Sequence, residues 1–156
     1  MDVNFISERL QEGLTITVNS ENNLDNNLSV IQNNSLGREA YRLQISEDKI
    51  RIEASHSTGV FYAFESLHQI LLIAQNEEKG WPIITIEDAP RFENRGFMSD
   101  VARNFYPKEK LFQILDYMAL YKLNRFDLKL TDDDGWRIEI PGLPELTEVG
   151  GKRGYT

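Results

Sequence analysis

Strict alternation of apolar and polar positions marks one clear hairpin in the first half of the chain. Residues 41–45 (YRLQI) and 50–54 (IRIEA) each place apolar side chains at every second position, as a strand with one buried face does. Glu47 and Asp48 lie between the two segments and supply a polar turn. The pattern therefore predicts two antiparallel strands joined by a short loop.

Shorter patterns surround this hairpin. Residues 3–12 have apolar positions at helical spacing, and residues 14–18 (LTITV) alternate as a half-buried strand does. The short apolar run 28–31 (LSVI) lies inside an asparagine-rich stretch and predicts one more strand between loops. Residues 83–89 (IITIEDA) predict the last strand of this region. The first half therefore reads as mixed α and β.

A helix is predicted from Ser57 to about Gln75, with Ser57 or Thr58 as its cap. Apolar residues step through it by four, three, four and three positions, which places them on one buried face. They are Val60, Phe64, Leu67, Leu71 and Ala74. The sequence Gly80–Trp81–Pro82 ends the helical region.

A strand, a helix and a second strand are predicted after Pro90. Residues 95–102 (RGFMSDVA) and 125–130 (RFDLKL) read as strands, and Pro107 suits the first position of the helix between them. The apolar side of that helix comprises Leu111, Ile114, Leu115, Met118 and Tyr121. A crossover of this kind predicts a parallel pair. The tail contains one strand-like run, WRIEI, at 136–140.

Composition and charge exclude several classes of function. With 156 residues, 40% hydrophobic and 27% charged, the chain has the balance of a soluble globular protein, and we expect no membrane span. A formal net charge of −8 opposes binding to nucleic acid. The absence of cysteine excludes disulfides and thiolate zinc sites, and no cluster of metal ligands stands out. The opening residues, MDVNFISERL, lack the basic and then apolar pattern of a signal peptide.

Charged groups gather at the ends of the two predicted parallel strands. The first end reads Ser99-Asp100-Val101-Ala102-Arg103-Asn104, and the second continues from Leu130 through Asp132 to Trp136. Both ends lie on the side of a parallel sheet where ligands bind. An arginine, carboxylates and an indole suit a carbohydrate. From the residues alone a second interpretation stays open, in which Arg103 pairs with Asp100 or Asp132 to hold the strand ends. The acidic run would then be a solvated turn, and Trp136 a packing residue.

Two segments resemble one enzyme family. PRFENRGFMSDVARNFYP (90–107) and MALYKLNRFDLKLTDDDGWRIEIPGLPELTEVG (118–150) closely resemble family 20 of the glycoside hydrolases, the β-N-acetylhexosaminidases, and its bacterial chitobiase branch in particular. The runs EAYRLQIS (39–46) and KIRIEASHSTGVFYAFESLHQIL (49–71) resemble the small α+β domain that precedes the catalytic barrel in that family.

The resemblance implies a fold and a division into domains. Residues 1–89 would form the α+β accessory domain. Residues 90–156 would form the first strand-helix-strand portion of an incomplete (β/α)8 TIM barrel, with its sugar pocket at the carboxyl ends of the strands.

The resemblance also implies an activity. The parent enzyme would release terminal N-acetyl-hexosamine from glycans or chitin-like oligosaccharides, without metal or organic cofactor. It would use substrate-assisted retaining catalysis, in which the 2-acetamido oxygen attacks the anomeric carbon. Arg103 aligns with the arginine that holds the hydroxyls of the non-reducing sugar, and Asp132 aligns with an acidic residue that supports the pocket wall. The Asp–Glu pair that performs catalysis follows the fourth barrel strand and is absent from these residues, so we expect the chain alone to be inactive. A periplasmic or secreted location is compatible with such an enzyme.

Asp127 and Lys129 stand where the family usually has two histidines. Residues two apart share one face of a strand, so we expect these opposite charges to pair with each other, while Phe126, Leu128 and Leu130 face the helices. Two alternatives remain from the sequence. The chain could be a non-catalytic module that interacts with carbohydrate or protein, or its two barrel strands could pair between copies through their open edges.

Overall fold

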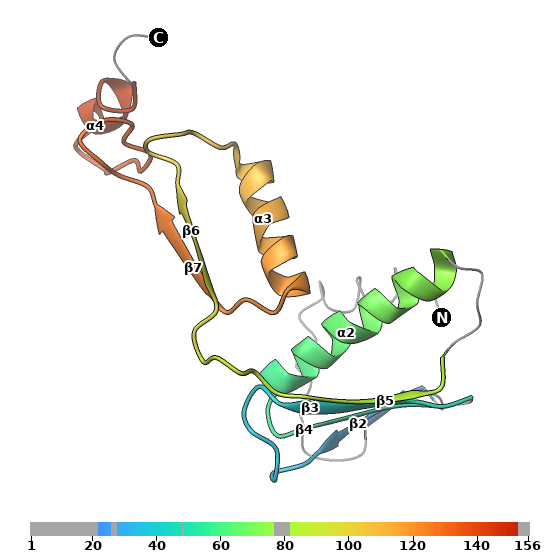
Figure 1. Cartoon of the computed structure of the whole chain (residues 1–156). Coiled ribbons are helices and arrows are strands. Elements are labelled where there is room, and N and C mark those ends of the chain that lie inside the picture. The colour runs from blue at the N-terminus through green and yellow to red at the C-terminus, as the bar shows by residue number, and fades with distance from the viewer. Residues whose placement is uncertain (1–21, 26–27, 48, 77–81, 153–156) are drawn as a thin grey trace. The chain divides into compact units, whose positions relative to one another are not determined.

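The structure is a computed structural model that describes residues 22–25, 28–47, 49–76 and 82–152. These residues belong to two compact units that divide between Glu93 and Asn94 (Figure 1). The helix predicted at 3–12 and the strand predicted at 14–18 lie outside the described residues.

The first unit contains a five-stranded mixed sheet. Its strands are β1 (Asn22–Asp25), β2 (Leu28–Gln32), β3 (Tyr41–Ile45), β4 (Ile50–Ala54) and β5 (Ile84–Asp88), in the spatial order β1-β2-β4-β3-β5. The predicted hairpin is confirmed, with β3 and β4 antiparallel and Leu43 opposite Ile52. The strand predicted at 28–31 is confirmed as β2, which runs parallel to β4, and the strand predicted at 83–89 is β5.

One long helix, α2 (Ser57–Asn76), lies across the sheet (Figure 1). Four of the five predicted face residues are buried, namely Val60, Phe64, Leu67 and Leu71. They pack with the apolar positions of β2, β3 and β4 into one core. Neither predicted cap, Ser57 or Thr58, is correct, because α2 already begins at Ser57 and the backbone N–H of Thr58 donates to His56 Nδ1 at 3.2 Å. The imidazole thus satisfies a first-turn donor that the helix itself leaves unpaired.

A largely buried carboxylate lies on the other face of the sheet. Glu53 is only 7% exposed, and its oxygens accept hydrogen bonds from Asn33 Nδ2 at 2.9 Å and from Arg51 Nε at 3.0 Å. Arg42, on the neighbouring strand, lies 4.0 Å away. The hydrogen bond from Asn33 and the charges of Arg51 and Arg42 lower the pKa of Glu53, against the opposing effect of burial.

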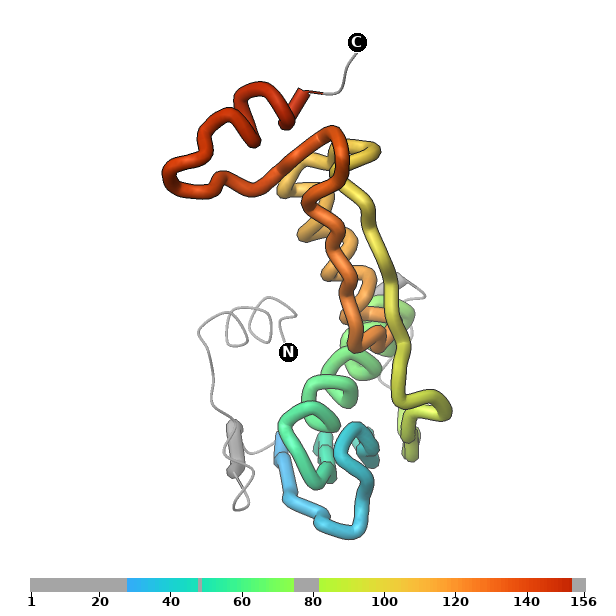
Figure 2. The backbone as a smooth tube through the Cα atoms, turned by 90° about the vertical axis from the view of Figure 1, so that its left-hand side faces the viewer, coloured from blue at the N-terminus to red at the C-terminus, as the bar shows by residue number. Residues whose placement is uncertain are grey.

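The second unit is a parallel β-α-β element. It consists of β6 (Gly96–Asp100), α3 (Lys108–Leu120) and β7 (Arg125–Lys129), followed by a short helix, α4 (Glu145–Glu148). The predicted parallel pairing is confirmed, and Gly96 lies opposite Arg125 while Asp100 lies opposite Lys129. The two strands therefore end level with each other (Figure 1), and Figure 2 shows their segments of the chain running side by side.

Three local predictions for the second unit need correction. Pro107 is the residue that caps α3 rather than its first helical residue. WRIEI forms no strand, because the N–H of Trp136 donates to Gly150 O and that of Arg137 to Leu130 O instead of to a ladder. Of the predicted apolar side of α3, only Met118 is buried. None of the helices within the described ranges is long and apolar enough to cross a bilayer.

Candidate functional site

The site lies where β6 and β7 end. Asp100 is the last residue of β6, and the chain turns immediately after it. Asp100 Oδ1 accepts the backbone N–H of Arg103 at 3.0 Å, and the Asp100 carbonyl accepts the N–H of Asn104 at 3.3 Å. This turn directs the Arg103 side chain back across the strand ends, toward the segment that follows β7.

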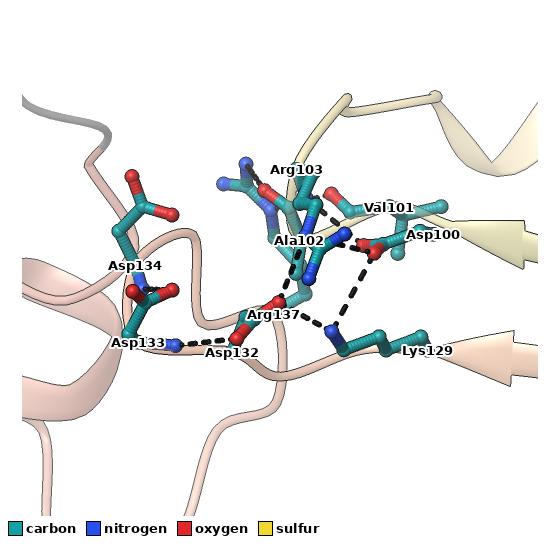
Figure 3. Close-up of polar contacts among 9 residues, drawn as sticks. All are labelled: Asp100, Val101, Ala102, Arg103, Lys129, Asp132, Asp133, Asp134 and Arg137. Carbon is teal, nitrogen blue, oxygen red and sulfur yellow. Dashed lines mark hydrogen bonds and ion pairs between the residues drawn. The ribbon is translucent and has the colours of Figure 1, made fainter.

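Four charged side chains meet there, and we refer to Asp100, Arg103, Lys129 and Asp132 as the charged cluster (Figure 3). Arg103 Nε lies 3.1 Å from Asp132 Oδ2 and 3.5 Å from Asp100 Oδ2. Lys129 Nζ forms a close ion pair with the same Asp132 oxygen and lies 3.6 Å from the same Asp100 oxygen. Each of these two carboxylate oxygens therefore faces two cations.

The contacts in the cluster favour the charged forms of Asp100, Lys129 and Asp132. The hydrogen bond from Lys129, followed by that from the backbone N–H of Asp133, holds the pKa of Asp132 far below its usual range. The backbone N–H of Arg103 is the main cause that lowers the pKa of Asp100. The hydrogen bond to Asp132 raises the pKa of Lys129. The two carboxylates and the ammonium group are therefore all ionised at neutral pH.

The structure corrects the predicted partner of Lys129. Lys129 and Asp127 do share a face of β7, but the ammonium group pairs with Asp100 and Asp132 rather than with Asp127. The register explains the choice, because Asp100 lies directly opposite Lys129 on β6. Residues two apart on one strand are about 6.6 Å apart, whereas neighbouring strands are about 4.8 Å apart.

Behind the cluster, Arg137 joins the loops that follow β6 and β7. Its guanidinium donates to the carbonyl oxygens of Val101 at 3.1 Å, Ala102 at 3.3 Å and Gly151 at 2.7 Å. It also lies over the ring of Phe105, 5.1 Å from the centroid. Val101 and Ala102 immediately precede Arg103, so this side chain supports the backbone of the charged cluster. Arg137 was not predicted as a site residue, because its only signal in the sequence is its position in the alternating run 136–140, which is typical of a strand.

The remaining acidic and aromatic candidates make local contacts. Asp132 Oδ1 accepts the N–H of Asp133 at 3.0 Å, and Asp133 Oδ1 accepts that of Asp134 at 3.1 Å, where the chain bends after β7. Trp136 donates its indole N–H to Ile138 O at 2.6 Å. Within the described ranges, no group of three or more histidine and acidic residues is arranged to hold a metal ion.

Comparison with known families covers both units. The family model described as "Glycosyl hydrolase family 20, domain 2" matches residues 1–89, and "Glycosyl hydrolase family 20, catalytic domain" matches residues 92–156. The chain belongs to glycosyl hydrolase family 20. The charged cluster therefore lies in the part of this family 20 chain that matches the catalytic domain.

Curated relatives and solved structures agree with this assignment. The chain is 53% identical over 114 residues to an N,N'-diacetylchitobiase of Vibrio harveyi, which covers 73% of the chain and 13% of that protein. It is 39% identical over 139 residues to a β-hexosaminidase of Vibrio vulnificus, covering 89% of the chain and 16% of that protein. A crystal structure of a family 20 exo-β-N-acetylglucosaminidase from Vibrio harveyi in complex with N-acetylglucosamine aligns with a TM-score of 0.71 and 38% identity. That alignment covers 94% of this chain and 23% of the other.

Proposed function

We propose that the charged cluster forms one wall of a pocket for the terminal sugar of an N-acetylhexosamine-ended glycan. Arg103 would donate hydrogen bonds to hydroxyl groups at the non-reducing end, and Asp132 would hold the guanidinium in place. The position of Arg103 carries this proposal. Its Nε edge faces two carboxylates at the ends of parallel strands, while 65% of its side chain stays exposed. A planar donor fork fixed along one edge suits neighbouring hydroxyls.

The whole protein would be an exo-β-N-acetylhexosaminidase. The names of the relatives support this reading, since they include a chitobiase and several β-hexosaminidases. The residues described here would bind and orient the sugar. The 2-acetamido group would act as the nucleophile, assisted by an Asp–Glu pair that the family places after the fourth strand of its barrel. The polypeptide 1–156 is accordingly expected to show no turnover by itself.

The test uses the protein encoded by the complete reading frame and an aryl β-N-acetylglucosaminide. In Arg103→Met, kcat/KM should fall about a hundredfold, because the substrate hydroxyls lose charged donors. Arg125→Met is the matched control, since Arg125 lies at the opposite end of β7 and should leave kcat/KM unchanged. Equal kcat/KM for wild type and Arg103→Met would contradict the role of Arg103.

A second experiment addresses exo action. A chitooligosaccharide whose terminal non-reducing hydroxyls are methylated removes the groups that Arg103 is proposed to bind. We expect the wild type to cleave the methylated substrate far more slowly than the unmodified one. In Arg103→Met the difference in rate between the two substrates should be much smaller. If the complete wild-type protein binds glycans but hydrolyses none of these substrates, a non-catalytic binding module is favoured.

A further inference from the structure

Lys129 joins the two strand ends through their carboxylates. It is the last residue of β7 and contacts Asp100, the last residue of β6, together with Asp132 on its own side. Arg103 contacts the same two oxygens, at 3.5 Å from Asp100 Oδ2 and 3.1 Å from Asp132 Oδ2. The four groups alternate in sign, with each carboxylate oxygen between two cations (Figure 3).

One guanidinium cannot balance both carboxylates. Asp100 and Asp132 converge on a single Nε atom, so without Lys129 the cluster would carry one excess negative charge and the two carboxylates would repel each other. They would separate, and Arg103 would follow one of them. The side chains of Asp100 and Asp132 are only 17% and 20% exposed, which limits the screening of this repulsion by solvent.

Lys129 is suited to holding its neighbours rather than to binding a ligand. Its ammonium group points at two carboxylates, that of Asp100 at the end of β6 and that of Asp132 in the loop after β7. An ammonium group is a compact charge that can contact both oxygens at once, and its ion pair with Asp100 joins β7 to β6. The arrangement gives it a geometric role in the cluster.

We propose that Lys129 is a positioning residue, which holds Asp100 and Asp132 at a fixed spacing across β6 and β7 and thereby sets the direction of the Arg103 guanidinium. This inference rests on the proposed function, in which Arg103 binds the terminal sugar. It goes further by assigning a role to a lysine at a position where the family usually has histidine.

The experiment compares Lys129→Met and Lys129→Arg in the protein encoded by the complete reading frame. With an aryl β-N-acetylglucosaminide, Lys129→Met should raise KM about tenfold and change kcat little, because misdirected Arg103 weakens binding of the ground state and the transition state alike. Lys129→Arg keeps the positive charge and should retain most of the affinity for the substrate, with a KM near that of the wild type. Lys110→Met is the control, since Lys110 is an exposed residue of α3 that contacts Gln113.

A double-mutant cycle tests whether Lys129 acts through Asp132. If it does, Lys129→Met should change KM much less in an Asp132→Asn background than in the wild type. Additive effects of the two substitutions would overturn the proposal, and so would a Lys129→Met variant with the KM of the wild type. A Lys129→Met variant that is unfolded at the assay temperature gives no KM. In that case the Lys129→Arg variant is the test, and a KM well above that of the wild type contradicts the proposal.

The titration of Asp132 provides a readout that general destabilisation would not give. The charged groups around Lys129 are Asp100, Arg103 and Asp132, with Asp127 on the same strand face. Because the hydrogen bond from Lys129 is the main cause that lowers the pKa of Asp132, its loss should raise that pKa toward the ordinary value of 3.8, which an NMR pH titration of the Asp132 carboxyl measures. An Asp132 titration that is unchanged in Lys129→Met would count against the proposal. Absence of all hydrolysis by the wild type would instead defeat the proposed function.

Discussion

The carbonyl oxygen of Ala102 occupies the space where Gly135 would otherwise carry a side chain. A β-carbon built on Gly135 would lie only 2.1 Å from that oxygen. The backbone of Gly135 has a φ of 73°, in the left-handed region. The loop after β7 therefore approaches the loop after β6 through main-chain atoms, directly beside the residue that precedes Arg103.

Gly135→Ala should consequently damage both stability and the site. The new methyl group would push the Ala102 carbonyl away, and we expect the free energy of unfolding to fall by about 2–4 kcal/mol. Denaturant unfolding measures this loss, and kcat/KM should fall as well, because Arg103 moves with its loop. Gly142→Ala is a matched control. Gly142 also has a positive φ, of 87°, but nothing lies within 4 Å of a β-carbon there, so its cost should be only about 1 kcal/mol.

Arg137→Lys should distinguish the hydrogen bonds that the Arg137 guanidinium makes to the loops from the effect of its positive charge. Lysine keeps the positive charge but cannot direct a planar fork at the carbonyls of Val101, Ala102 and Gly151. We expect a loss of about 2 kcal/mol in unfolding free energy, the usual value for hydrogen bonds of a charged donor, and a rise in KM. Arg125→Lys, at the far end of β7, should change neither quantity. Equal stability of Arg137→Lys and the wild type would show that the three carbonyl contacts contribute little.

Glu53→Gln should change how the first unit responds to acid. The pKa of Glu53 is lowered in the folded state, so its contribution to stability is present above the ordinary value of 4.5 and is lost as the pH falls below that value. Glu53→Gln should reduce the free energy of unfolding by about 1–2 kcal/mol at pH 7. Urea titrations between pH 7 and pH 3 should show the variant approaching the wild type at the acid end. Glu47→Gln, at the exposed hairpin turn, serves as the control, and a constant difference at all pH values would contradict this account.

Gly59→Ala should destabilise the first unit although alanine favours helices. A β-carbon at Gly59 would lie 2.5 Å from the carbonyl oxygen of Ala40 and 3.2 Å from the β-carbon of Ala54. Close packing of the first turn of α2 on the sheet thus requires glycine, and we expect a loss of about 2–3 kcal/mol. Gly37→Ala would make only an ordinary contact at 3.9 Å and should be nearly neutral. Thermal unfolding of the two variants compares them directly.

Regular apolar spacing predicted the elements whose conformation depends on the burial of side chains. It failed for the segments whose conformation depends on backbone hydrogen bonds. The hairpin and the buried face of α2 follow from regular apolar spacing, and both were confirmed. β1 lies in a polar asparagine-rich stretch and exists as a strand through its pairing with β2. WRIEI has the alternation of a strand, but its first backbone donors reach loop carbonyls. No side-chain pattern carries that information.

The site was predictable in part for a related reason. Parallel strands predicted that Arg103 and Asp132 would meet, and their ion pair is present. This contact also fits the structural interpretation that the residues alone left open, and a ligand-binding role for it stays a prediction. The partner of Lys129 depended on the register between β6 and β7, which places it opposite Asp100. A single strand read by itself offers only Asp127, so the sequence indicated the wrong carboxylate.

The in-register pairing of β6 with β7 also limits how this segment can change in length during evolution. Each residue added to or removed from a strand turns every following side chain to the opposite face. Deletion of one residue between Arg125 and Lys129 would carry the ammonium group to the opposite face of the strand and turn a leucine toward Asp100. The loops that follow the strands have no such alternation of faces, so a change in their length does not turn later side chains of a strand to the other face. We therefore expect related genes to vary in length between Gly142 and Glu145, while the five positions of β7 keep a constant number.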